Sequence, residues 1–202
     1  MPQRKRPGAY HHGDLGRALT DAAIELLAEV GPSFTLRQAA KRVGVTHGAA
    51  YRHFEDRDAL LAEVARRGYL ALHAALERAV RQADTPRQQI EGILRAYVRF
   101  ARRHPAQFDL MFGQRLNESG RFPALEAALE KVVMVLAGAV GAQLGTPDRT
   151  AIRDRSLAIW SLAHGYTTSV LHRRIKVKST PAAERFLCEL AAPFLEAGAA
   201  GR

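Results

Sequence analysis

The sequence contains little cysteine and no long uninterrupted hydrophobic run. Cys188 is the single cysteine in 202 residues, so no disulfide can form within the chain, and this fits a reducing cytosol. The longest apolar run, residues 132–144, is interrupted by glycines and by Gln143 and is too short for a membrane span. No apolar segment follows the basic N-terminal residues, as it would in a secretory signal. These absences predict a cytoplasmic protein that does not bind membranes.

The usual signatures of enzymes are also missing. The sequence has no glycine-rich phosphate loop, no HExxH zinc motif and no GxSxG nucleophile elbow. Its only cysteine is remote from His11 and His12, so a zinc site on that histidine pair is not expected. Glu126 and Glu130 are spaced like charges on a helix surface. We therefore predict a protein that is not an enzyme and has no metal and no cofactor.

Positive charge is in excess, but it is unevenly distributed. The formal net charge is +10, which suggests a polyanionic partner such as nucleic acid. Residues 1–60 carry nine basic and seven acidic side chains, so they contribute only +2 of this total. The remaining +8 lies after residue 60. Net charge is therefore a weak guide, and the positions of individual residues must support any prediction.

Helical periodicity recurs along the whole chain, whereas the alternation typical of strands does not. Threonine–proline pairs at 85–86, 146–147 and 180–181 each resemble an N-cap followed by proline in the first helical turn. The sequence predicts an all-α fold of about nine helices, at residues 13–30, 35–43, 46–53, 57–83, 86–103, 106–114, 123–144, 147–174 and 181–197.

Residues 35–54 have the layout of a helix-turn-helix. Thr35 is placed to cap a short helix, with Gln38 at the capping-box position. Gly44 follows that helix where a tight turn needs a left-handed residue, and Thr46 is placed to cap a second short helix. In this motif the second helix enters the DNA major groove. Similar hairpins also occur in helical proteins that do not bind DNA, so the pattern alone leaves both interpretations open.

The second short helix is rich in groups that form hydrogen bonds. Its N-terminal residues would meet base edges first, which makes His47 and the Gly48 backbone candidate base contacts. Tyr51, His53 and Arg57 suit phosphates, and Arg37 suits a guanine or a phosphate. The alternative is that such residues are ordinary solvated surface groups.

The sequence resembles the TetR family of regulators. The resemblance rests on Tyr-His-His-Gly-Asp-Leu at 10–15, on the run from Thr35 to Phe54, and on Asp-Arg-Asp-Ala-Leu-Leu at 56–61. Trp-Ser-Leu-Ala-His-Gly at 160–165 also resembles the WHG-type C-terminal domain of one branch of that family. One departure is Gly16, where relatives more often carry a basic residue, although Arg17 stands next to it.

The resemblance implies a ligand-responsive transcriptional regulator that binds a palindromic operator in double-stranded DNA as a homodimer. Repression is the usual outcome in the family, and activation stays open. The implied organisation is a flexible basic arm (1–12), a helix-turn-helix domain (13–56) and a ligand-binding and dimerisation domain (57–202), with 57–83 as connecting helix. The implied DNA contacts are Thr35, Arg37, His47, Gly48, Tyr51, His53 and Arg57.

The last two helices are the expected dimer interface, and a ligand site is expected in the same domain. The apolar residues predicted at the interface are Ile152, Ile159, Phe186, Leu190 and Phe194. An unidentified, hydrophobic small-molecule effector is expected to contact Tyr97, Phe108, Met111, Phe112, Trp160 and His164. The alternative is that these six residues pack together without enclosing a ligand.

Two further hypotheses concern basic residues. Arg4, Lys5 and Arg6 could enter a minor groove or follow phosphates, or they could form a solubilising tail. The arginines after residue 60 are also compatible with binding to an anionic membrane or to a protein partner. Against a membrane, residues 90, 93, 94, 97 and 98 have the pattern of an ordinary core face opposite those arginines.

Overall fold

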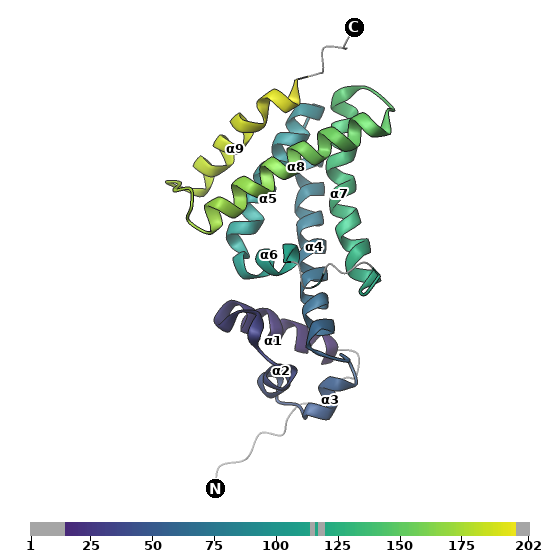
Figure 1. The fold of residues 1–202 in the computed structure, drawn as a ribbon, viewed down its shortest axis with the longest axis vertical. Coiled ribbons are helices and arrows are strands. Elements are labelled where there is room, and N and C mark those ends of the chain that lie inside the picture. Colours follow the sequence, from purple (N-terminus) through teal and green to yellow (C-terminus); the bar gives the residue numbers. More distant parts are fainter. Residues whose placement is uncertain (1–14, 114–115, 117–119, 197–202) are drawn as a thin grey trace. The chain divides into compact units, whose positions relative to one another are not determined.

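The computed structural model describes residues 15–113, 116 and 120–196, and within these ranges it is helical with no strand (Figure 1). The elements are α1 (Leu15–Val30), a 3₁₀ turn η1 (Gly31–Ser33), α2 (Leu36–Val43), α3 (His47–Tyr51), α4 (Arg57–Arg81), α5 (Pro86–Arg103), α6 (Pro105–Phe112), α7 (Pro123–Leu144), α8 (Arg149–Leu171) and α9 (Thr180–Leu195). The predicted all-α class is confirmed. The basic arm lies outside the described residues.

Capping residues explain where several helices begin. At α2 the Gln38 backbone N–H donates to Thr35 Oγ1 (3.2 Å) and Gln38 Oε1 accepts from the Thr35 backbone N–H (2.7 Å). Thr85 and Gln88 form the same capping box at α5. Each box satisfies donors that a helix N-terminus otherwise leaves unpaired.

Two of the predicted threonine caps are wrong. Asp148, and not Thr146, caps α8, because the Asp148 carboxylate accepts from the backbone N–H groups of Thr150 and Ala151. Ser179 caps α9, so Thr180 lies inside the helix. In both cases a neighbouring side chain with an equally good acceptor competes for the N-cap position.

The chain divides into two compact units, with the boundary between Val64 and Ala65, inside α4. In the N-terminal unit α1 packs against α2, and α2 packs against α3. Its core is formed by the fully buried residues Leu19, Ala23, Phe34, Leu36, Ala39, Ala50 and Leu60. These apolar contacts hold helices that would be too short to be stable alone.

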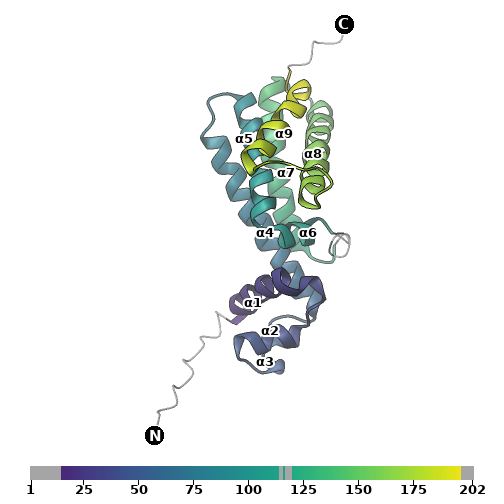
Figure 2. The ribbon, with the colours of Figure 1, turned by 90° about the vertical axis from the view of Figure 1, so that its left-hand side faces the viewer.

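In the C-terminal unit α5 is the central helix and contacts α6, α7, α8 and α9 (Figures 1 and 2). The predicted core face of α5 is confirmed, since Ile90, Ile93, Leu94, Tyr97 and Val98 are all buried. Helix α9 packs against both α5 and α8.

Helix α8 carries apolar residues on two faces, and this changes one prediction. Ile159 is fully buried and belongs to the core, not to the expected dimer interface. Ile152 is half-buried beside Gly141, where an added Cβ would lie 3.1 Å from Ile152 Cδ1. Leu157 and Trp160 are the exposed apolar residues of α8, at 56% and 39%.

Candidate DNA-binding surface and C-terminal cavity

The turn between α2 and α3 has the predicted glycine geometry. Gly44 adopts a left-handed backbone (φ 79°), and its N–H donates to the carbonyl groups of Ala40 and Lys41. A residue with a Cβ would be strained in that conformation. The next residue, Val45, donates its N–H to the Ala40 carbonyl (3.0 Å), which closes the turn. Helix α3 then starts at a fixed angle to α2.

Helix α3 is anchored on one side and open on the other. The Thr46 side chain accepts from the Ala49 backbone N–H (3.2 Å), and both Ala49 and Ala50 are buried. His47 and Tyr51, one turn apart, are exposed, and their ring centroids lie 4.5 Å apart. The ring contact restrains two side chains that can both form hydrogen bonds with a partner.

The predicted DNA-contacting residues are mostly at the surface of the N-terminal unit. Those that are exposed are Thr35, Arg37, His47, Gly48, Tyr51 and His53. Arg57 differs, because Nη1 donates to the Pro32 carbonyl (3.3 Å) and Nη2 lies 3.5 Å from Asp58 Oδ1. Arg57 therefore joins α4 to the chain before α2, and only part of its guanidinium is left for a phosphate.

Gly48 has no role in packing within the protein. A Cβ added there would meet nothing within 4 Å, and its φ is not positive. A glycine inside a helix costs up to about 1 kcal/mol relative to alanine. Neither packing nor backbone conformation accounts for this cost. The absent side chain leaves the exposed backbone of α3 open to close approach from outside.

Gly16, at the position where the family resemblance implies a basic residue, lies next to His53. A Cβ built on Gly16 would be 3.5 Å from His53 Nδ1, an ordinary contact distance. The departure therefore borders a predicted phosphate-contacting side chain. A longer side chain at position 16 would compete with His53 for the same space.

Several cations of the N-terminal unit are paired internally. Arg42 on α2 forms a two-pronged contact with Glu29 on α1, at 2.6 and 2.7 Å. Hydrogen bonding to Arg42 lowers the pKa of Glu29 below its ordinary value. Lys41 and Arg52, which are absent from the predicted DNA contacts, are exposed beside the predicted surface. They extend the set of candidate phosphate contacts.

In the C-terminal unit five of the six predicted ligand-contacting residues form one aromatic cluster: Tyr97, Phe108, Phe112, Trp160 and His164. Tyr97 and Phe108 meet edge to face at 5.4 Å, Phe112 lies 4.7 Å from His164, and Trp160 stacks on His164 at 5.3 Å. Tyr97, Phe108 and Met111 are buried. The structure thus brings these five together, but they fill the space between them with their own side chains, whereas buried Met111 accepts a hydrogen bond from the Tyr69 hydroxyl through its backbone carbonyl.

A polar pair lies inside this cluster. The Tyr97 hydroxyl is 2.9 Å from His164 Nδ1. Burial raises the pKa of Tyr97 and lowers the pKa of His164, so both groups are neutral near pH 7. A neutral imidazole carries its proton on one ring nitrogen, so the tautomer of His164 decides whether Nδ1 accepts from the Tyr97 hydroxyl or donates to it, and either bond orients the ring.

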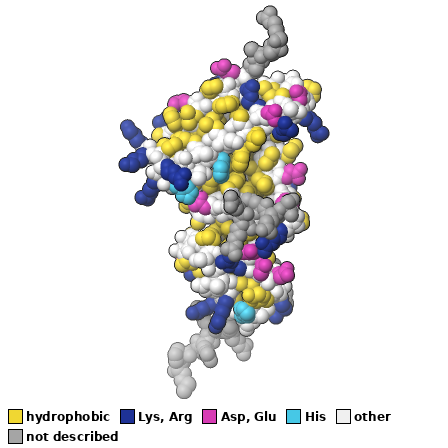
Figure 3. Space-filling view, viewed as in Figure 1, with side chains coloured by type: hydrophobic (Ala, Val, Ile, Leu, Met, Phe, Trp, Pro, Cys, Tyr) yellow, Lys and Arg dark blue, Asp and Glu magenta, His cyan; other side chains and the backbone are white. Residues whose placement is uncertain are grey.

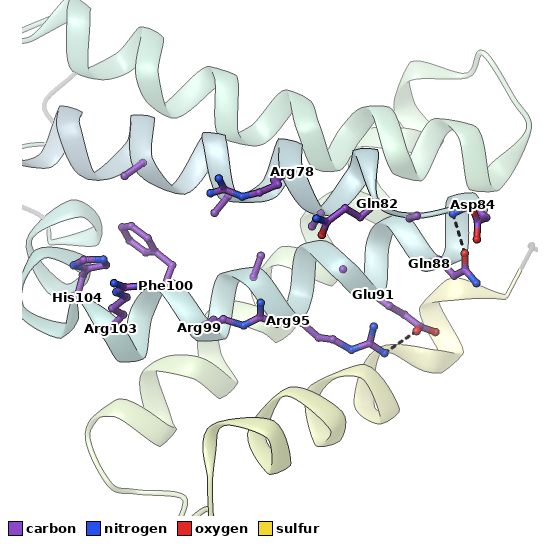
Figure 4. Close-up of a pocket in the computed structure, with 16 residues that line it drawn as sticks. Arg78, Gln82, Asp84, Gln88, Glu91, Arg95, Arg99, Phe100, Arg103 and His104 are labelled. Carbon is purple, nitrogen blue, oxygen red and sulfur yellow. Dashed lines mark hydrogen bonds and ion pairs between the residues drawn. The ribbon is translucent and has the colours of Figure 1, made fainter.

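A cavity of about 760 Å³ lies elsewhere in this unit, between α4 and α5 (Figure 4). Its lining includes none of the six predicted ligand-contacting residues. It consists of Ala71, Ala75, Arg78, Ala79, Gln82, Ala83, Asp84, Gln88, Glu91, Gly92, Arg95, Ala96, Arg99, Phe100, Arg103 and His104. The sequence pattern of isolated arginines did not reveal this cavity, because it depends on how closely two helices approach.

Hydrophobic side chains gather on the surface over α8 and α9 (Figure 3). On α9 the exposed apolar residues Phe186, Leu190 and Phe194 follow one another at four-residue spacing. On α8 the exposed residues Leu157, Ser161 and Gly165 have the same spacing, and a Cβ added at Gly165 would meet nothing within 4 Å. We call these six residues the α8–α9 face.

The capped pair of short helices, the left-handed Gly44 and the exposed polar side of α3 define a helix-turn-helix protein of the DNA-binding class. Residues 19–64 match the family model of the bacterial regulatory proteins of the tetR family. Residues 90–192, more than half of the chain, match the model of the tetracyclin repressor-like C-terminal domain. The chain belongs to the TetR family of transcriptional regulators, which are not enzymes.

Solved structures share this fold along nearly the whole chain. A protein of unknown function from Rhodococcus sp. RHA1 is 29% identical, with a TM-score of 0.79, 94% of this chain covered and 97% of the other. A regulatory protein of the tetR family from Rhodococcus RHA1 is 20% identical, with a TM-score of 0.72 and coverages of 91% and 97%. The regulator FadR from Bacillus subtilis, solved in complex with stearoyl-CoA, is 18% identical, with a TM-score of 0.69 and coverages of 90% and 98%. The comparison with curated proteins finds no match.

Two features are absent from residues 15–113, 116 and 120–196. No helix among them is both long enough and apolar enough to cross a lipid bilayer. No group of three or more His, Cys, Asp or Glu side chains in the same ranges could hold a metal ion.

Proposed function

We propose that this regulator is a repressor that binds a palindromic DNA operator as a homodimer and responds to a small-molecule ligand. The proposed DNA-binding domain is residues 13–56 and the proposed ligand-binding and dimerisation domain is residues 57–202. A cytoplasmic location is proposed with it, because a DNA-binding regulator acts where the chromosome lies. Repression itself follows the usual behaviour of the family.

The observation that carries the DNA-binding proposal is the open side of α3. Gly48 leaves the backbone of α3 uncovered there, and the side chains of His47 and Tyr51 on the same helix are exposed. A major groove about 12 Å wide admits such a helix, and a residue without a side chain lets it approach the base edges closely. Arg37, Lys41 and Arg52 are exposed in the same unit and suit phosphates.

The α8–α9 face supports the homodimer. A helix of five residues contacts too few base pairs for specific binding, so two copies are needed. The small residues Ser161 and Gly165 would let α8 approach its copy closely, while Phe186, Leu190 and Phe194 would bury apolar surface. Such a self-complementary contact gives the two-fold symmetry that a palindromic operator reflects.

Ligand response would act through α4. This helix begins at Arg57 in the N-terminal unit and ends at Arg81 in the C-terminal unit, and residues from Ala71 onward line the cavity. A ligand that displaced this part of α4 would act on the helix that both units share. FadR, solved with stearoyl-CoA, supports the idea that proteins of this fold hold a ligand. Direct contact of a ligand with Tyr97, Phe108, Met111, Phe112, Trp160 or His164 stays a prediction.

The test is selection of bound duplexes from a random pool by the purified full-length protein. We expect an inverted repeat whose half-sites are about one helical turn apart, since the two helix-turn-helix domains of a symmetric dimer must contact one face of the DNA. Enrichment of a single unrepeated site would contradict the homodimer. Failure to enrich any duplex over several rounds would overturn the DNA-binding proposal.

A further inference from the structure

The cavity between α4 and α5 has an apolar floor made of small side chains. Ala71, Ala75 and Ala79 follow one another at four-residue spacing on α4, and Gly92 and Ala96 face them from α5. A Cβ added at Gly92 would lie 3.3 Å from the Ala79 Cβ, so the two helices approach closely at that point. Small residues on both helices therefore create an elongated groove, and its volume of about 760 Å³ falls in the range of small-molecule sites.

Four arginines border this floor, and two of them form no ion pair with an acidic side chain in the part of the chain that the structure describes. Arg95 pairs with Glu91 at 3.0 Å and Arg99 pairs with Glu184 at 3.0 Å. Arg78 on α4 and Arg103 on α5 form no ion pair with any residue in the described ranges. The Arg78 side chain extends over the groove toward the end where Phe100, Arg103 and His104 lie (Figure 4). Positive charge without a counter-charge thus collects at that end.

The two ends of the groove differ in charge. Asp84 and Glu91 lie at the opposite end, where α4 gives way to α5. At the arginine end Phe100 is buried and its ring centroid is 5.1 Å from that of His104. Glu91 is neutralised by its ion pairs with Arg87 and Arg95, so an anion would be repelled mainly by Asp84 at that end and attracted to the end with Arg78 and Arg103. The groove can therefore orient an occupant as well as bind it.

We propose that this groove binds an elongated amphipathic organic anion, with its apolar body on the alanine floor and Phe100. Its carboxylate or phosphate lies between Arg78 and Arg103. An anion of this kind supplies the missing counter-charge and covers apolar surface that is open to water. The inference rests on the proposed function, because the anion would be the effector of the regulator.

The test is calorimetric titration of the full-length protein, without DNA, with decanoate and decyl phosphate. Decanol, which has the same chain and no charge, is the ligand control. Arg78→Gln with Arg103→Gln removes both unpaired charges from exposed positions, so the variant should fold normally. Arg102→Gln is the matched protein control, because Arg102 is exposed on the same helix and does not line the groove. Ala75→Leu narrows the floor without changing any charge.

We expect the wild type to bind both anions more tightly than decanol. The double variant should weaken both by at least about tenfold, as loss of charge-assisted hydrogen bonds implies, and Arg102→Gln should stay within about twofold. Ala75→Leu should also weaken both anions. Equal affinities of the double variant and the wild type would overturn the proposal. So would the absence of any anion binding by the wild type at about 1 mM.

Failure of this inference can be separated from failure of the proposed function. The same preparation is used for duplex selection. Enrichment of an inverted repeat without anion binding would overturn the groove as a site and leave the DNA-binding regulator intact. Anion binding without enrichment of any duplex would overturn the proposed DNA recognition alone.

Discussion

The two units of the molecule expose different kinds of surface. In the N-terminal unit the apolar residues of α2 and α3 are turned inward, and the open side of α3 presents imidazole, phenol and bare backbone. In the C-terminal unit α8 and α9 leave Leu157, Phe186, Leu190 and Phe194 more than a third exposed. A polar surface with hydrogen-bonding groups suits a hydrated, charged partner, whereas an apolar face suits another apolar face. The difference supports the proposal that the N-terminal unit binds DNA and the C-terminal unit self-associates.

The units also differ in what fixes their geometry. Helices α2 and α3 have eight and five residues, and capping side chains and Gly44 set the angle between them. Helices α7 and α8 have 22 and 23 residues, and their positions depend on packing against α5 and each other. Local hydrogen bonds therefore set the angle between α2 and α3, while long-range contacts set the positions of the helices in the domain that would hold a ligand.

The largest effect is expected from placing charge on the α8–α9 face, the proposed dimer interface. Leu157→Glu with Leu190→Glu would place carboxylates where two copies are proposed to bury apolar surface. We expect the dissociation constant of the dimer to rise by at least about a hundredfold, because a buried unpaired charge is costly. Sedimentation equilibrium measures the change.

The control for this variant is Val133→Glu, which charges an equally exposed apolar residue on α7. It should leave the sedimentation behaviour unchanged. A double variant that sediments as a dimer would show that the α8–α9 face is not the interface.

A second prediction separates the two faces of α8. Ile159→Ala should lower the free energy of unfolding by about 2–5 kcal/mol, because it leaves a cavity in the core. Leu157→Ala, two residues away and exposed, should cost less than about 1 kcal/mol in the dilute protein. Urea unfolding at two protein concentrations measures both. Only Leu157→Ala should reduce the dependence on concentration, and equal effects of the two variants would contradict the distinction.

A third prediction concerns helix α3 of the helix-turn-helix. Gly48→Ala should raise the free energy of unfolding by up to about 1 kcal/mol, since the added methyl group meets no neighbour and favours the helix. The same methyl group should weaken operator binding by about tenfold, because it keeps α3 away from the base edges. Thermal unfolding and a gel-shift titration measure the two effects.

Gly138→Ala on α7 is the matched control, because Gly138 is also helical, exposed and free of neighbours. It should stabilise the fold to a similar extent without changing operator affinity. If Gly48→Ala binds DNA like the wild type, the open space at position 48 has no role in recognition.

The smallest expected effect is a pH dependence in the C-terminal unit. Burial lowers the pKa of His164, so the unfolded chain binds a proton there at a higher pH than the folded chain does. Stability is therefore full above the ordinary histidine pKa of about 6.5 and is lost as pH falls below it toward the lowered value. His164→Gln keeps an acceptor for Tyr97 but does not titrate. Its melting temperature should fall less between pH 7.5 and 5.5, as measured by calorimetry, and an unchanged slope would contradict the assignment.

Most helix positions could be predicted from the sequence because their signals are local. Thr35, Gly44 and Thr46 each act on atoms within a few residues, so their pattern predicts the helix-turn-helix directly. The start of α8 was misplaced because Thr146 and Asp148 are both good caps, and only the folded backbone shows which one accepts the hydrogen bonds. Local patterns fail where two local solutions have similar energies.

The C-terminal site could be predicted only in part. The spacing of Trp160 and His164 correctly placed them on one face of α8, and they do stack. The spacing could not show that Tyr97 and Phe108 would fill the space between them, or that a cavity would open between α4 and α5 instead. Arg78 and Arg103 resemble ordinary surface charges in the sequence, because only the folded chain shows that neither forms an ion pair with a residue in the described ranges.

The empty space beside Gly48 also bears on how this regulator could change its target. A Cβ added at that position meets no atom within 4 Å, so a small new side chain there would leave the core undisturbed. Under the proposed recognition of DNA by α3, it would alter DNA preference. Thr46, in the same helix-turn-helix, cannot vary so freely, because its side chain accepts a hydrogen bond from the Ala49 backbone N–H. If α3 reads DNA as proposed, a single mutation at position 48 is therefore a route to a regulator with a different set of target genes and an intact structure.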